Sequence, residues 1–327
     1  MKRALLLAPI LALACSSTNS GTSDADAGAP PPPTTTLAQT CARGPKVTTM
    51  PATCNGDAAL CAKTYDVVTV PMTHNAHSVV EDGFGPGVAN QDFEPARQLA
   101  DGIRGMMLDL HYYEPETNLT DNGRLDGPSA VDQVYFCHGT CAFGKKRALD
   151  DLCQLTSFLD QNPGEVLSII FETYVTDADT AAVLKAAGLD EYAFAHPDPK
   201  APWPTLREMI DSGKRLVVFV EKGGGDPPWI MPAYEGNVWE TPYSFDHVTD
   251  FNCNTNRGLD DSPLYLINHW LGPLPAKSNA EQVNVDALLG KRVADCTAAR
   301  GRKPTFVSVD FYDVGDLFSV VKRTNGL

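Results

Sequence analysis

Polar and ionisable side chains recur directly after apolar runs along this chain. The run Tyr65–Val70 leads into the letters PMTHNAHS, which place His74 and Asn75 just beyond a predicted strand. Asp109 and His111 end the next apolar run in the same way. Because parallel strands bring their carboxyl ends to one face of an α/β fold, such residues would converge on one site.

Later apolar runs end similarly. They supply His138, Glu172, the neighbours Glu221 and Lys222, and finally Asp310. Any single one of these residues could be structural, but their repetition at equivalent positions favours a site. Histidine titrates near neutral pH, so two histidines among carboxylates predict general acid–base catalysis.

Hard oxygen donors are also present at these positions. Asn75, Asp109 and Glu172 offer amide and carboxylate oxygens, which are the ligands that Ca²⁺ and Mg²⁺ prefer. The cysteines lack the paired CxxC spacing of zinc sites. The residues therefore favour a divalent cation, with Ca²⁺ as the candidate.

The order of the predicted elements favours a (β/α) TIM-like barrel of the α/β class. We expect strands at 66–70, 103–110, 133–137, 166–171, 215–220, 264–268 and 305–309, and helices at 94–100, 147–161, 178–187, 206–210, 283–299 and 315–324. Alternating elements over roughly 270 residues suit a barrel of about 250 residues. An open doubly wound sheet is the alternative, and the lack of a G-x-G-x-x-G motif after the first strand counts against it.

The charge balance limits the partners. With 41 acidic and 26 basic residues, the net charge is −15. A nucleic-acid-binding protein needs a basic surface to displace counterions, so we do not expect this protein to bind nucleic acid. Adsorption to anionic lipid by charge is disfavoured for the same reason.

The first forty residues are typical of an exported protein. Residues 1–14 have a basic start and an apolar stretch too short to span a bilayer, which predicts a signal peptide. The Ser-, Thr- and Pro-rich residues 15–40 predict a disordered tether, and 41–327 a single barrel domain. Ala12–Ala14 fits an ordinary cleavage site, whereas a lipobox ending at Cys15 would make a lipoprotein. Lipidation of Cys15 leaves eight of nine cysteines for disulfides, which favours an exported bacterial lipoprotein of the cell envelope.

Six segments resemble a known family: VTVPMTHNAHS, QLADGIRGMMLDLHYYE, VYFCHGTC, FLDQNPGEVLSIIFETYVT, GKRLVVFVEKGG and VSVDFYDVGDLFSVVKRTNG. They are similar to the phosphatidylinositol-specific phospholipase C X-domain superfamily, above all to secreted phospholipase-C-like phosphodiesterases. The resemblance covers the chain from Cys54 to its end. It implies a distorted TIM barrel that cleaves a phosphodiester by two-histidine acid–base catalysis.

The resemblance also implies individual roles. His74 matches the general base that deprotonates the inositol 2-hydroxyl, and His138 matches the general acid that protonates the departing diacylglycerol oxygen. Asp310 matches the residue that orients the first histidine in bacterial members. Asp109 matches the acidic residue after the second strand.

The family's metal-binding pattern is only partly present. Asn75 and Glu172 match two calcium ligands of the metal-dependent branch, and the metal-free branch has a basic residue in place of Glu172. His111 departs from both branches, which have an acidic ligand or an arginine there. Either Asn75, Asp109 and Glu172 hold Ca²⁺ together with the substrate phosphate, or His111 contacts that phosphate as a cation. Lys222 is a further expected phosphate partner.

Other residues receive a structural interpretation. His77 is expected to be a loop residue and Arg104 a structural one away from the active face. The resemblance supports a Cys253–Cys296 disulfide, while Cys54–Cys61 and Cys137–Cys141 are plausible local bridges. These three pairs leave Cys41 and Cys153 as the remaining candidates for a disulfide.

The sequence therefore predicts an exported phosphoric diester hydrolase or lyase that acts on a phosphatidylinositol-like phospholipid. One alternative keeps the fold and changes the substrate, as in glycerophosphodiesterase-like or sphingomyelinase-D-like enzymes. Another is a surface-tethered binding protein with an inactive barrel. The headgroup, the metal and the oligomeric state stay open at this point.

Overall fold

A computed structural model describes residues 41–114, 119–120 and 130–327. The predicted signal peptide 1–14 and tether 15–40, with Cys15, lie outside the described residues and stay predictions. The described residues from Cys41 to Leu327 belong to one compact unit. Among the described helices, none is both long and apolar enough to cross a bilayer.

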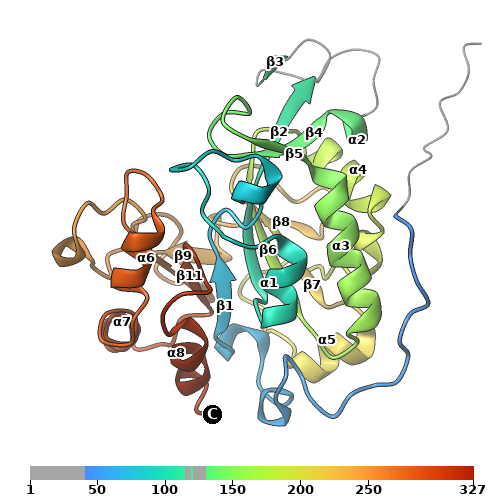
Figure 1. Cartoon of the computed structure of the whole chain (residues 1–327). Coiled ribbons are helices and arrows are strands. Elements are labelled where there is room, and N and C mark those ends of the chain that lie inside the picture. Colours follow the sequence, from blue (N-terminus) through green and yellow to red (C-terminus); the bar gives the residue numbers. More distant parts are fainter. Residues whose placement is uncertain (1–40, 115–118, 121–129) are drawn as a thin grey trace, which may run out of the picture. The chain divides into compact units, whose positions relative to one another are not determined.

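Parallel strands form a curled half-barrel sheet (Figure 1). Its hydrogen-bonded order is β8-β7-β6-β2-β1-β11-β10-β9, and every pair along it is parallel. The bounds are β1 Val70–Thr73, β2 Gly105–Glu114, β6 Leu167–Thr173, β7 Leu216–Val220, β8 Ile230–Pro232, β9 Val238–Glu240, β10 Leu264–His269 and β11 Phe306–Val309. Because the first strand pairs with the last, the order is that of a barrel and not of a doubly wound sheet.

Helices lie outside this sheet and cover it. They are α1 Pro95–Asp101, α2 Ala130–Gln133, α3 Ala148–Gln161, α4 Asp177–Ala186, α5 Leu206–Ser212, α6 Lys277–Val283, α7 Leu289–Arg300 and α8 Leu317–Thr324. In α3 the buried side chains Leu152, Leu155 and Leu159 recur at helical spacing, so one face packs inward. Strands such as β7 are buried along their whole length, as in sheets covered on both faces.

One predicted strand does not belong to the barrel. The segment expected at 133–137 is β4, Val134–Cys137, which runs antiparallel to β2 and pairs with β5, Lys145–Arg147. The short β3, Leu119–Thr120, also pairs antiparallel with β2. The prediction that β4 is a barrel strand was wrong, because β2 extends beyond the barrel and β4 returns along it. Phe136 pairs with Leu110, so β4 ends beside the level of Asp109.

Other boundaries differ for local reasons. The strand expected at 66–70 starts only at Val70, since Tyr65–Val67 forms a 3₁₀ turn that packs the Tyr65 ring on Trp203, with 4.7 Å between centroids. Residues 226–261, where no helix or strand was expected, contain the barrel strands β8 and β9.

The helix expected at 283–299 is α7, which starts six residues later than predicted, and a separate helix, α6, ends at Val283 just before it. Asn284 ends α6, and its side-chain amide donates to the Asp310 carbonyl at 2.9 Å. This bond ties the end of α6 to the residue that follows β11.

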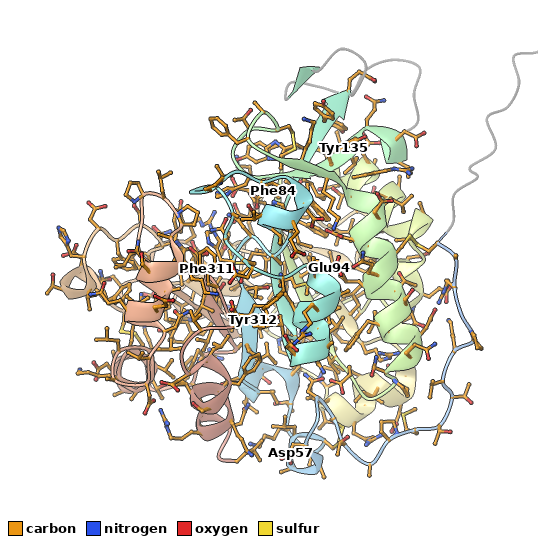
Figure 2. The ribbon with its side chains drawn as sticks, in the orientation of Figure 1. Asp57, Phe84, Glu94, Tyr135, Phe311 and Tyr312 are labelled. Atoms are coloured by element: carbon orange, nitrogen blue, oxygen red, sulfur yellow. A yellow bond between two sulfur atoms is a disulfide. The ribbon has the colours of Figure 1, made fainter. Side chains whose placement is uncertain are left out.

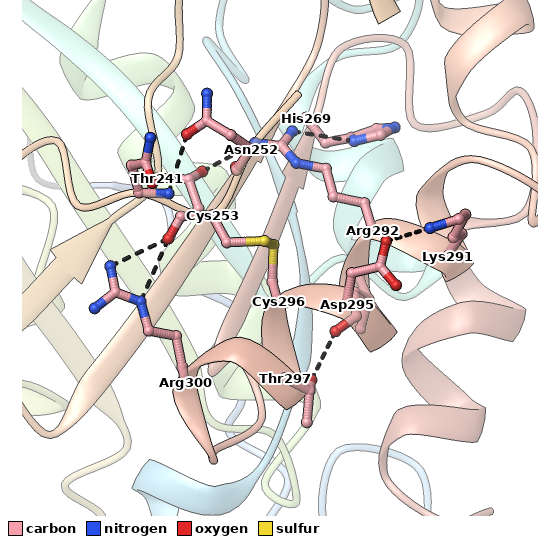
Figure 3. The surroundings of a disulfide bond; sticks show 12 residues. Thr241, Asn252, Cys253, His269, Lys291, Arg292, Asp295, Cys296, Thr297 and Arg300 are labelled. Carbon is pink, nitrogen blue, oxygen red and sulfur yellow. Dashed lines mark hydrogen bonds and ion pairs between the residues drawn. A yellow bond between two sulfur atoms is a disulfide. The ribbon is translucent and has the colours of Figure 1, made fainter. Parts of the chain in front are cut away.

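All four expected disulfides are present. They are Cys41–Cys153, Cys54–Cys61, Cys137–Cys141 and Cys253–Cys296. Figure 3 shows the last of these, which ties the loop after β9 to α7. Arg300 donates to the Cys253 carbonyl beside it at 3.1 Å.

Candidate functional site

The turn after β1 is held rigidly between its neighbours. The His74 amide donates to the Val309 carbonyl of β11 at 3.0 Å, and the Ala76 amide donates to the Met107 carbonyl of β2 at 2.9 Å. Asn75 has a φ of 44°, a left-handed conformation that asparagine tolerates better than most residues. The turn can therefore leave the strand sharply and present His74 and Asn75 at the mouth of the barrel.

The His74 ring is oriented on two sides. Its Nδ1 lies 2.8 Å from Asp310 Oδ1, and its ring stacks on Trp270 with centroids 3.8 Å apart and an interplanar angle of 5°. Asn90 donates to the same carboxylate oxygen at 2.9 Å. Since a carboxylate accepts, Nδ1 carries a proton, and in the neutral ring Nε2 is free to act as a base.

His138 reaches the mouth from the β4–β5 hairpin. Its Nδ1 donates to the Val88 carbonyl at 2.6 Å, so this ring also directs Nε2 away from its anchor. The Cys137–Cys141 disulfide closes the loop that carries it. Burial lowers the pKa of His138 below its ordinary value, and the neighbouring His74 adds to this lowering.

Asn75 lies between the two imidazoles. With its amide nitrogen toward Asp109, at 3.0 and 3.3 Å from the two carboxylate oxygens, its oxygen lies 3.3 Å from His74 Nε2 and 3.1 Å from His138 Nε2. Both Nε2 atoms thus flank one oxygen. An imidazole ring that donates from both Nε2 and Nδ1 carries a positive charge. The position between the two Nε2 atoms is therefore suited to an oxygen atom with negative charge.

Carboxylates gather beside Asn75. Asp109 of β2 lies in register with Glu172 of β6. Burial raises the pKa of Asp109 well above its usual range, and Glu172 and Glu221 raise it further. The Tyr174 hydroxyl donates to Glu172. Burial and the neighbouring carboxylates therefore favour the protonated form of Asp109 as long as no positive charge lies beside it.

The donor set suits a divalent cation by charge and by oxygen chemistry. Within the described residues, however, no group of three or more His, Cys, Asp or Glu side chains is arranged to hold a metal ion. In the orientation that satisfies its hydrogen bonds, the Asn75 amide directs its nitrogen to Asp109 and its oxygen to the two histidines. In the opposite orientation its oxygen faces the Asp109 carboxylate and joins the donor set.

The two expected phosphate partners lie near one aromatic ring. His111 is 1% exposed and stacks on Tyr174, with centroids 4.3 Å apart. Lys222 is exposed, and its Nζ lies 5.7 Å from the centroid of the same ring. A phosphate could reach Lys222 from solvent, whereas it could reach His111 only after Tyr174 moved.

Arg257 was missed at the sequence level because it lies in a segment rich in turns and aromatic residues. Its guanidinium donates to both oxygens of Glu221 after β7, at 2.8 and 2.9 Å, and its Nε donates to Glu240 of β9 at 2.5 Å. Tyr234 donates to Glu240 at 2.9 Å. Arg257 therefore links the carboxyl end of β7 to β9, which lie near opposite ends of the sheet order.

The two residues given a structural interpretation also have defined places. Arg104 lies before β2, donates to Glu165 at 2.6 Å and to the Leu99 carbonyl at 2.8 Å, and so stands away from the mouth. His77 lies in the turn after β1, as expected for a loop residue, and its side chain is fully buried. Trp270 stacks on His74 and Asn90 donates to Asp310, so both residues support the His74–Asp310 pair.

Fold and site together define an α/β barrel protein whose mouth carries two histidines and several carboxylates. The chain belongs to the PI-PLC X domain family, whose model matches residues 60–325. The resemblance identified from the sequence is thereby confirmed.

Curated relatives carry the same domain. The chain is 29% identical over 311 residues to an "Uncharacterized secreted protein" of Arthroderma benhamiae, covering 84% of this chain and 64% of that protein. It is 28% identical to "PI-PLC X domain-containing protein 1" of the same fungus, covering 84% and 90%. A PI-PLC X domain-containing protein of Arabidopsis thaliana is 30% identical, covering 78% and 61%. The chain thus spans less than two thirds of the first and third of these proteins.

Solved structures share the fold. The phosphatidylinositol-specific phospholipase C of Listeria monocytogenes matches with a TM-score of 0.50 at 14% identity, covering 82% of this chain and 97% of that one. A variant of the Staphylococcus aureus enzyme matches with a TM-score of 0.51 at 13% identity, covering 81% and 93%. At this identity the likeness shows the fold alone, and it confirms the barrel expected from the sequence.

Proposed function

We propose that this protein is a phosphoric diester hydrolase or lyase that cleaves a phosphatidylinositol-like phospholipid. The observation that carries the proposal is the pair of Nε2 atoms, of His74 and His138, on either side of one oxygen. The names of the relatives with the same domain and the fold of the bacterial phospholipases support it.

The proposed reaction needs one base and one acid. His74, oriented by Asp310, takes the proton of the attacking hydroxyl at Nε2 while the new P–O bond forms. His138 gives the proton of its own Nε2 to the departing alkoxide as the old P–O bond breaks. An attacking inositol hydroxyl yields a cyclic phosphodiester, and water in place of the leaving group then opens it with the two roles exchanged.

His138 must be protonated to begin this cycle. Its buried position opposes the charge, since desolvation lowers its pKa. A bound phosphodiester carries negative charge close to the ring and would favour the protonated form. The substrate itself thus helps to establish the acid.

A divalent cation completes the proposal. Asp109 and Glu172 would hold it, joined by Asn75 if its amide oxygen turns toward them. When bound, the ion supplies positive charge that stabilises the phosphate oxygens during the reaction. The concentration of carboxylates on a chain of net charge −15 supports this, because an unbalanced acidic mouth would repel a phosphodiester.

The test uses purified protein and phosphatidylinositol vesicles, with Ca²⁺ in one arm and EDTA in the other. A cyclic inositol phosphate is the expected product, and loss of turnover in EDTA is the expected result for the cation. Release of free choline, or of glycerol phosphate, from the matching phosphodiesters would instead support the alternative substrates. If His138→Ala leaves hydrolysis unchanged, the acid–base proposal is wrong. If the wild-type protein hydrolyses none of these substrates, a binding protein is favoured.

Export is also proposed. The signal-like residues 1–14 and the printed name of a secreted fungal relative support it. The bacterial lipoprotein expected from Cys15 finds no support in these relatives, which are fungal and plant proteins. Mass spectrometry of the mature amino terminus decides between plain cleavage after residue 14 and a lipid on Cys15.

A further inference from the structure

His77 is a buried histidine of the first motif that the proposed chemistry does not use. It belongs to the same turn as His74, and its side chain is fully buried. Its ring lies 5.6 Å from the Phe84 ring, which is labelled in Figure 2, and 5.3 Å from the Phe136 ring of β4. The ring therefore packs between the turn after β1 and the strand that leads to His138.

One hydrogen bond connects His77 to the second histidine. Its Nε2 lies 3.2 Å from the carbonyl oxygen of Cys137, the residue directly before His138. A carbonyl oxygen only accepts, so Nε2 must carry the proton. Nδ1 is buried and has no hydrogen-bond partner among the described residues. His77 therefore has a single polar contact there, and this contact reaches the peptide that carries His138.

Both ends of this connection are firmly held. The turn is anchored at Ala76, whose amide donates to Met107 at 2.9 Å, and at Ser78, whose amide donates to Asn75 at 2.8 Å. On the other side, the His138 ring donates to Val88 at 2.6 Å. His138 is thus held at its ring by Val88 and Asn75 and at its preceding carbonyl by His77.

We infer that His77 is a positioning residue that sets His138 Nε2 relative to His74 Nε2 through the Cys137 carbonyl. The inference rests on the proposed function for its kinetic consequence. Its structural core, the tautomer of His77 and its effect on the His138 ring, can be measured without any substrate. Misplacing a catalytic group by about 1 Å can lower a rate by about 100-fold.

Three substitutions separate the hydrogen bond from simple packing. In His77→Gln the terminal amide nitrogen has a reach similar to Nε2 and can still donate to Cys137. In His77→Asn the amide ends where Nδ1 lies and falls short, and in His77→Leu the donor is absent. We expect kcat to fall about 10- to 100-fold for asparagine and leucine, with KM within about twofold, and glutamine to stay within about threefold of wild type.

His196 provides a matched control. It is 7% exposed, its Nε2 lies 3.2 Å from the Ala201 carbonyl, and its ring stacks on Trp203 with centroids 4.0 Å apart. His196→Leu removes an equivalent buried hydrogen bond remote from the mouth. It should lower the melting temperature and leave kcat unchanged.

Nitrogen-15 NMR of the histidine rings tests the same idea in the absence of turnover. Wild-type His77 should show the Nε2–H tautomer, and His138 ring signals should shift or broaden in His77→Asn but not in His77→Gln. An Nδ1–H tautomer for wild-type His77 would overturn the inference, and this measurement requires no variant to fold. Unchanged His138 signals and wild-type kcat in folded His77→Asn would overturn it equally. If wild-type protein shows no turnover, the proposed function fails while the NMR result still decides the role of His77.

Discussion

Asp310 offers the sharpest test of how His74 is activated. The Asp310 side chain is 6% exposed, and its Oδ1 accepts from His74 Nδ1 at 2.8 Å and from Asn90 at 2.9 Å. In Asp310→Asn, Asn90 still donates to an oxygen at this position and so holds that oxygen toward His74. The tautomer is then preserved and only the negative charge is lost.

The magnitude follows from that geometry. A hydrogen bond to a charged group contributes about 1.5–3 kcal/mol, which corresponds to a rate loss of about 10- to 150-fold. If Asn90→Ala is added, the amide can rotate and offer its nitrogen to His74 Nδ1. That ring would then carry its proton on Nε2 and could no longer accept one. The same tautomer inversion in the triad of serine proteases lowers kcat by about 10⁴-fold.

We therefore expect kcat/KM for a phosphatidylinositol substrate to fall about 100-fold in Asp310→Asn and about 10⁴-fold in the double variant Asp310→Asn with Asn90→Ala. Asp313→Asn is the matched control, because Asp313 pairs with Lys277 at 3.0 Å and lies on the same loop. Steady-state kinetics with thermal unfolding as a check on folding provide the assay. A single variant within threefold of wild type, or a double variant no slower than the single, would refute the reasoning.

Three further predictions concern residues around the mouth and the core. Trp270→Leu removes the ring stacked on His74 and should lower kcat about tenfold, whereas Trp270→Phe should retain most of it; equal loss in both would contradict a stacking role. Arg257→Gln leaves Glu221 and Glu240 without their shared cation and should lower the free energy of unfolding by about 3–5 kcal/mol in urea titrations, and a change under 1 kcal/mol would show that the network adds little. Burial lowers the pKa of His269 to about 3, so neutral His269 is favoured in the folded state. Its contribution to stability is present above about pH 6.5 and is lost as the pH falls toward 3, by at most about 1.4 kcal/mol per pH unit. His269→Gln should flatten the urea-derived stability between pH 6.5 and 4, and an unchanged slope would contradict this.

Much of the fold could be predicted from local pattern. Apolar runs such as Val166–Phe171 and the helical spacing in Arg147–Gln161 indicated β6 and α3, since burial on a strand or one helix face leaves a period in the sequence. The strands β8 and β9 left no such trace. Each has three residues, and their pairing depends on neighbours far away in the chain.

The candidate site divides in the same way. The chain's sequence by itself determined which groups could carry chemistry, because His74, His138, Asp109 and Asp310 each follow or end an apolar run. Only the tertiary structure decided how they meet. His138 arrives on a strand antiparallel to β2, a direction that no local pattern encodes.

The supporting contacts depend on tertiary structure entirely. Trp270 against His74, and Arg257 between two carboxylates, join segments that are distant in the sequence. The sequence indicated no role for His77 within its motif. Only the folded structure places the Cys137 carbonyl within hydrogen-bonding distance of its ring. The residue types determine which side chains can donate or accept a proton and which carry a charge. Which of these groups face each other is determined only when the strands pair and bring distant segments together.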